Sequence, residues 1–119
     1  MPQEAAGERE RGMSDANIPA LLEELREVDF ETWKDIRFLL SNSMMFPEPR
    51  EIPLEQHIYH DIIQGCIQRA CEHQKWIWHH GHGPEMGYVA TVNHGNIIKG
   101  ETSAAAILAA YIEAVRASR

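Results

Sequence analysis

Cysteine is scarce in this chain of 119 residues, which holds only Cys66 and Cys71. They lie five positions apart on one predicted helix, which keeps their Cα atoms beyond the roughly 7 Å limit for a disulfide bond. No disulfide framework is predicted, so a reducing compartment is the default. Long apolar runs are also missing, since no stretch approaches the ~20 residues of a membrane span. We therefore expect a soluble, cytoplasmic protein.

Basic residues are few: 11 Lys and Arg stand against 18 Asp and Glu, and the net charge is −7. Binding to nucleic-acid phosphates needs clustered Lys and Arg, so direct nucleic-acid binding is not expected, and neither is an anionic membrane surface. The charged N-terminus also has no apolar signal core. The expected partners are basic protein surfaces or neutral small molecules.

The chain is short enough to form one domain. Residues 1–14 have almost nothing to bury and are predicted to be a disordered leader; whether they belong to the natural product is left open, because Met13 would serve as a start. Residues 15–119 are predicted to be a single α+β domain. Its first half is helical: helices are expected near 17–28 and 30–40, with a break and new N-cap at Asp29 and a stop at 41–43.

A proline-rich connector at 46–53 precedes a third predicted helix over 54–73. Beyond it the residue pattern changes to a period of two. A strand over 75–79 would place Trp76 and Trp78 on the same side of a sheet, whereas a helix continuing to Trp78 would leave one indole in water. We favour the strand. A loop over 80–87 would follow it.

The last part predicts a hairpin and a helix. Tyr88, Ala90 and Val92 should face one side of the hairpin, and Asn93–Asn96 should form its turn, with Gly95 supplying a positive φ. After Gly100 an alanine-rich helix begins, capped by Thr102 or Ser103. The predicted fold is therefore α+β: N-terminal helices, a short antiparallel β-meander, and a C-terminal helix packed on the sheet.

A meander of two or three strands is marginal by itself, and its edges stay unpaired, with only Lys99 as an obvious edge guard. Self-association would resolve this, either by edge-to-edge pairing or by packing of the tryptophan-bearing faces. We predict a homodimer or larger homo-oligomer.

Four stretches of the C-terminal region resemble a known module: Tyr88–Val92, Asn93–Gly95, Ile97–Glu101 and the alanine-rich run from Thr102. Together they are similar to the strand–turn–strand–helix that ends many small phage-encoded accessory proteins. The resemblance covers about a quarter of the chain. It implies a phage or mobile-element origin, a location in the host cytoplasm, and an interaction role. No functional residue is carried over from it.

Aromatic and imidazole side chains gather in the meander. Trp78, His80, His82 and Tyr88 are the candidate binding residues, because aromatic rings grip partner peptides or stack on planar ligands. His80 and His82 also have a spacing that offers two imidazoles to zinc or nickel, with Glu85 or a partner chain as third ligand. Against this, no recognised metal motif is present. Whether the histidines bind metal is left open, and no cofactor is expected.

Catalytic signals are weak. His57 and Asp61 are four apart on the third helix and can pair, but no activated nucleophile accompanies them, and both cysteines lie near the apolar stripe. We predict no catalytic residues and a non-enzymatic interaction module that binds a host protein or a small ligand as a homo-oligomer. One alternative is a small metal-dependent enzyme that uses the loop histidines. Another is an acidic decoy for a basic DNA-binding protein, built on the glutamates and aspartates of the first two helices.

Overall fold

The computed structural model describes residues 18–44 and 57–119, which form four helices and a three-stranded antiparallel sheet. The elements run in the order α2 (Ile18–Val28), α3 (Phe30–Met44), α4 (His57–Gln74), β1 (Trp78–Gly83), β2 (Gly87–Val92), β3 (Ile98–Gly100) and α5 (Ser103–Ala117). The predicted α+β class is confirmed. The predicted leader at 1–14 and the connector at 46–53 lie outside the described residues. Among the described helices, none combines the length and the apolarity needed to cross a bilayer.

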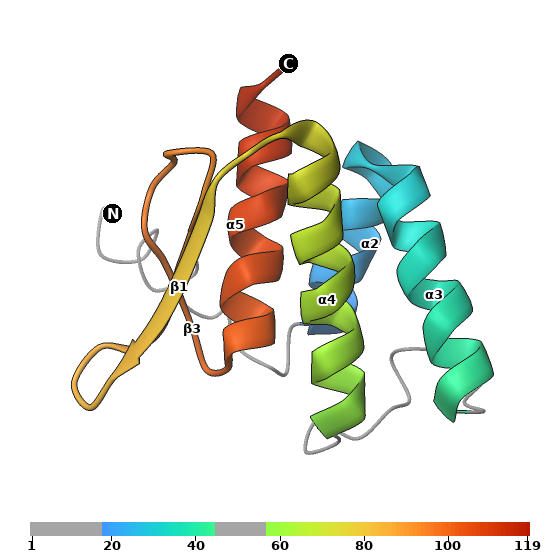
Figure 1. The fold of residues 1–119 in the computed structure, drawn as a ribbon, viewed down its shortest axis with the longest axis horizontal. Coiled ribbons are helices and arrows are strands. Elements are labelled where there is room, and N and C mark those ends of the chain that lie inside the picture. Colours follow the sequence, from blue (N-terminus) through green and yellow to red (C-terminus); the bar gives the residue numbers. More distant parts are fainter. Residues whose placement is uncertain (1–17, 45–56) are drawn as a thin grey trace.

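Helix α5 lies at the centre of the fold, between the sheet and the other helices (Figure 1). It contacts all three strands on one side and packs against α4 and α2 on the other, while α3 contacts α2 and α4. Ten residues of α5 are buried. The alanine-rich sequence suits this position, because small side chains let a helix approach a sheet on one side and other helices on the other.

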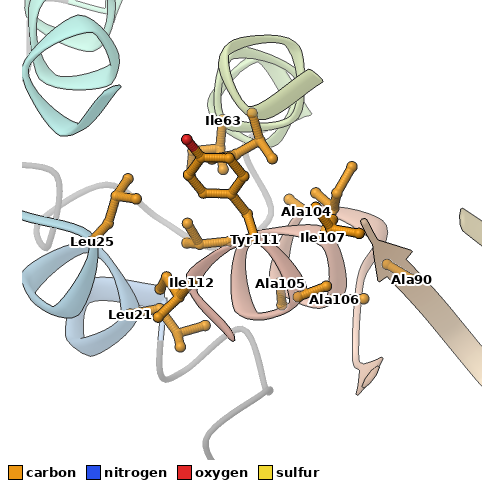
Figure 2. Packing of buried hydrophobic residues seen from close by; sticks show 14 of the residues in the cluster. Leu21, Leu25, Ile63, Ala90, Ala104, Ala105, Ala106, Ile107, Tyr111 and Ile112 are labelled. Carbon is orange, nitrogen blue, oxygen red and sulfur yellow. The ribbon is translucent and has the colours of Figure 1, made fainter. Parts of the chain in front are cut away.

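The core is built largely from apolar residues at helical spacing. In α2 five such residues are buried: Ile18, Leu21, Leu22, Leu25 and Val28. In the core, the Tyr111 ring of α5 points toward α4 beside Ile63, and Leu21 of α2 lies near Ile112 (Figure 2). Each fully buried side chain of this size contributes roughly 1.5–3 kcal/mol. The core therefore joins α2 and α4 to α5 on the side of α5 that faces away from the sheet.

Asp29 separates the first two helices, as predicted. Its carboxylate accepts a hydrogen bond from the Thr32 backbone N–H at 3.2 Å, which caps the start of α3. One detail of α3 differs from expectation, because the helix runs to Met44 instead of stopping at 41–43. Two of its large apolar side chains, Phe30 and Phe38, are 48% and 65% exposed.

Helix α4 ends at Gln74, and Lys75 adopts a φ of 64°. The Lys75 N–H donates to the Glu72 carbonyl at 3.1 Å and the Trp76 N–H donates to the Cys71 carbonyl at 2.8 Å. This pair of bonds is a Schellman motif, which stops the helix and turns the chain. The helix therefore does not continue to Trp78, but the strand does not begin at 75 either. It begins at Trp78, so the expectation that Trp76 and Trp78 share a strand face is wrong.

The predicted loop at 80–87 is also corrected, because His80 to Gly83 belong to β1. The hairpin turn is confined to 84–86, and Gly87 closes it with a φ of 71°. In β2 the alternation is as predicted, with Ala90 and Val92 buried.

The turn between β2 and β3 lies where it was predicted, but its backbone differs. Asn93 and His94 have φ values of 54° and 61°, and the Gly95 N–H donates to the Val92 carbonyl at 3.0 Å. Two successive positive φ values mark a type I′ turn, in which Gly95 takes the position after the two left-handed residues. Gly95 therefore does not supply the positive φ expected of it.

Candidate functional site

The strand β1 lies at the edge of the sheet, since the strand order is β1-β2-β3. Its register against β2 pairs Trp78 with Val92 and His80 with Ala90. Just beyond the strand, the Asn93 N–H donates to the Ile77 carbonyl at 2.7 Å. In an antiparallel ladder the direction of the backbone groups alternates. The backbone groups of the odd-numbered residues therefore point to β2, and those of Trp78, His80 and His82 point outward.

No described residue pairs with that outer edge of β1. The strand Trp78–Gly83 also contains no proline and no charged side chain, the usual protections of an edge strand. The opposite edge, β3, is only three residues long and carries the exposed Lys99. Of the two edges, β1 is the longer and the less protected.

All four predicted binding residues lie on one face of the sheet. Trp78, His80 and His82 alternate along β1, and Tyr88 is the cross-strand partner of His82. Their face is the one that α5 covers, because Ala90 and Val92 share it and are buried. Trp78 and Tyr88 are half-buried against the core, whereas His80 and His82 are exposed. The structure therefore places the predicted binding residues together along the open edge.

Two short contacts organise this aromatic–histidine surface (Trp78, His80, His82 and Tyr88). The His82 and Tyr88 rings stack with centroids 4.4 Å apart and planes tilted by 37°. The His80 Nδ1 atom lies 3.5 Å from the hydroxyl of Ser103, the first residue of α5. Both imidazoles are thus held close to the sheet beside the edge, where an incoming strand would meet them.

Trp76 does not belong to this surface. Its ring lies 5.9 Å from that of Tyr111, and it packs against the core at the α4–β1 junction. Trp76 therefore has a packing role, since the apolar residue that follows the left-handed residue of a Schellman motif contacts the last turn of the helix.

In the part of the chain that the structure describes, the histidines of the meander are not brought together as a metal site. His79 points away from His80 and His82, and His94 lies in the β2–β3 turn. Across residues 18–44 and 57–119, no three His, Cys, Asp or Glu side chains are grouped so that they could hold an ion. The alternative of a metal-dependent enzyme therefore gains no geometric support from the described residues.

The cysteines are free and buried. Burial raises the pKa of Cys71 to about 11, and it also raises that of Cys66 despite the nearby Arg69. Few thiolates form at neutral pH under these conditions, which makes both side chains weak nucleophiles. Of the other predicted pair, Asp61 is exposed and the side chain of His57 lies outside the described residues.

The acidic residues of α2 and α3 are partly engaged within the fold. Glu24 pairs with Arg116 at 2.9 Å, and Glu31 pairs with Lys34 at 3.3 Å. Asp29 accepts hydrogen bonds from the Thr32 hydroxyl at 2.7 Å and from the Tyr111 hydroxyl at 2.5 Å. An acidic decoy needs many free carboxylates on one surface. These contacts reduce that number.

A cleft of about 930 Å³ lies between α3 and α4. Its polar lining includes Asp29, Asp35, Arg69 and Tyr111. Burial, with the hydrogen bond to Asp29, raises the pKa of Tyr111 to about 12, so the hydroxyl remains a hydrogen-bond donor at neutral pH. Asp29, Thr32 and Tyr111 in the lining are thus hydrogen-bonded to one another, which is a structural role.

One surface cluster escaped the sequence analysis. The Arg26 and Arg37 guanidinium carbons lie 5.0 and 5.6 Å from the centre of the Trp33 ring, and the Phe30 ring is 5.4 Å away. Arg37 and Trp33 are four apart on one helix, a spacing that could have been noticed. Arg26 is on α2, and only the angle between the two helices brings it to Trp33.

Comparison of the chain with protein-family models, with curated proteins and with solved structures finds no match. The phage origin implied by the C-terminal module therefore stays a prediction.

Proposed function

We propose that the protein is a non-enzymatic interaction module that receives an extended polypeptide segment along the outer edge of β1. The observation that carries this proposal is the combination of a six-residue edge strand without protecting residues and the aromatic–histidine surface beside it. Main-chain hydrogen bonds to Trp78, His80 and His82 would supply affinity. Side chains on the same face would supply specificity, as in other cases of β-strand addition.

The direction of the backbone groups makes the proposal testable by proline substitution. In His80→Pro the lost N–H points outward, so the ladder to β2 keeps its hydrogen bonds, whereas one bond to the added strand disappears. His80→Ala is the matched control, because it removes the imidazole and keeps the N–H.

The probe is a set of extended dodecapeptides selected from a random display library on the purified chain. We expect His80→Pro to weaken their binding by at least about tenfold, the loss of roughly one well-made hydrogen bond. His80→Ala should weaken it less. Amide hydrogen exchange of His80 and His82 should slow in the complex. Peptides that bind His80→Pro as tightly as the unaltered chain, or that leave those two amides unprotected, would contradict the proposal.

A further inference from the structure

We infer that the segment received by β1 is the β1 strand of a second copy of this chain, paired antiparallel about a twofold axis at His80. The inference rests on the proposed function, since it names the partner of the same edge. It commits to one arrangement of the two copies, and the arrangement follows from the direction of the backbone groups.

The three residues whose backbone groups point outward are evenly spaced about His80, with Trp78 two positions before it and His82 two positions after it. In the register centred on His80, His80 pairs with its own counterpart, Trp78 pairs with the second copy's His82, and His82 with its Trp78. Every outward N–H and C=O of these three residues then finds a partner. Registers centred on 78, 79, 81 or 82 would each leave at least one of these three residues opposite a position outside the strand. The register centred on His80 is therefore the one that uses the whole edge.

The side chains along the edge do not oppose this pairing. Trp78–Gly83 carries no Asp, Glu, Lys or Arg, so no such charges of like sign face each other. On the face near α5, the half-buried Trp78 would lie directly opposite the exposed imidazole of the second copy's His82. Side chains of directly opposite residues are close enough to be in contact. On the other face, Gly81 would lie opposite His79, and its Cα faces open space.

Charge at the two ends favours the same register. If the register centred on His80 is continued past the strand ends, the hairpin tip of each copy lies beside the α4–β1 junction of the other. Glu85 at the tip and Lys75 at the junction are both exposed and have opposite charge. The same two regions carry exposed apolar side chains, Met86 at 53% and Ile77 at 52%. Such an exposed ion pair adds little energy but disfavours other registers.

The twofold axis would be perpendicular to the sheet, so the two sheets would join into one of six strands with both α5 helices on the same face. The two aromatic–histidine surfaces would then be continuous across the axis. Pairing of single edge strands buries less area than a permanent interface of more than ~1,200 Å². We therefore expect a dimer that dissociates on dilution.

Sedimentation equilibrium of the full chain, from low to high micromolar concentration, gives the first test. The mass should rise toward twice the 13.6 kDa of one chain. His80→Lys should weaken the dimer by at least about tenfold, because two like charges then face each other at the axis. Ile97→Lys is the control: it adds the same charge at a residue that is 65% exposed, but beside β3, the opposite edge of the sheet, so the mass should not change.

A mixing experiment tests the axis itself. His80→Lys and His80→Glu should each be weakly associating when alone, and an equimolar mixture should form a heterodimer. Only a residue that faces its own counterpart behaves in this way. Circular dichroism must show both variants folded.

Three outcomes would overturn the inference: a monomer mass for the folded chain throughout, no heterodimer in the mixture, or an equal effect of Ile97→Lys. If the chain is monomeric yet its peptide binding is still lost in His80→Pro, the self-pairing fails while the proposed function stands. If the peptides also bind His80→Pro unchanged, both fail.

Discussion

Tyr111 is the residue at which the core and the polar contacts between helices meet. Its side chain is fully buried, and its hydroxyl donates to Asp29, the residue that caps α3 and also accepts from Thr32. A hydrogen bond to a charged acceptor contributes more than one between neutral groups, about 1.5–3 kcal/mol. The single hydroxyl therefore joins α5 to the α2–α3 break, 82 residues away in sequence.

The substitution Tyr111→Phe should lower the free energy of unfolding at pH 7 by about 1.5–3 kcal/mol, measured by urea denaturation. The variant also removes a pH dependence. Burial and the bond to Asp29 raise the Tyr111 pKa from 10.0 to about 12 in the folded state. The contribution of the protonated hydroxyl is thus complete below pH 10 and declines as the pH rises from 10 toward 12, because the unfolded chain ionises first.

The unaltered protein should accordingly lose on the order of 2 kcal/mol more than Tyr111→Phe between pH 9 and pH 12. Tyr88→Phe is the control and should keep the alkaline loss, because Tyr88 lies half-buried in the sheet and not in this hydrogen-bonded group. Equal alkaline losses in the unaltered protein and in Tyr111→Phe would show that the hydroxyl is not protected as described.

For the helices and strands, the sequence predicted the structure well where the spacing of the apolar residues and the capping residues indicate the same element. The α2 stripe, the break at Asp29 and the alternation in β2 have strong local signals, and all three are present in the structure. The predicted position of β1 was wrong because its residues are poor strand formers. With Gly81, Gly83 and three histidines, this stretch has a composition typical of a loop. They form a strand because the adjacent β2 and the short turn at 84–86 pair them, which is a tertiary effect.

The β2–β3 turn stores strain that a substitution can release. His94 has a φ of 61°, a conformation that costs a residue with a side chain roughly 1 kcal/mol and a glycine almost nothing. Asn-Gly is accordingly the preferred pair for a type I′ turn. We expect His94→Gly to raise the free energy of unfolding by about 0.5–1 kcal/mol, seen as a higher urea midpoint with an unchanged slope.

His94→Ala is the matched control, because alanine retains the cost of the positive φ and removes only the imidazole. It should leave stability within about 0.5 kcal/mol of the unaltered chain. If alanine stabilised the turn as much as glycine, the imidazole and not the backbone would be the source of the strain.

For the whole molecule, the outward-directed edge and the surface formed by Arg26 and Trp33 were the features that sequence alone could not reveal. Both depend on how elements distant in sequence are placed relative to one another. The candidate residues Trp78, His80, His82 and Tyr88 were predicted from their chemistry, and the structure places them on a single face. What the sequence did not contain was the strand order, which places β1 at an edge of the sheet.

The central position of α5 predicts that the sheet and the helices unfold together. Ala104, Ala105 and Ala106, at the start of α5, are fully buried beside the strand that carries Ala90 (Figure 2). Ala106 is 0% exposed, so a larger side chain there must displace its neighbours, and Ala106→Leu should lower the free energy of unfolding by about 1–3 kcal/mol through overpacking. Ala117→Leu adds the same atoms at the exposed end of the helix and should change stability by less than about 0.5 kcal/mol.

The loss should appear as one transition, because α5 contacts both layers. Circular dichroism reports the helices, and the fluorescence of Trp76 and Trp78 contributes a signal from beside the sheet. Their urea curves should coincide in the unaltered chain and shift together in Ala106→Leu. If fluorescence changed at a lower urea concentration than circular dichroism in that variant, the sheet would be separable from the helices, and α5 would not couple the two layers.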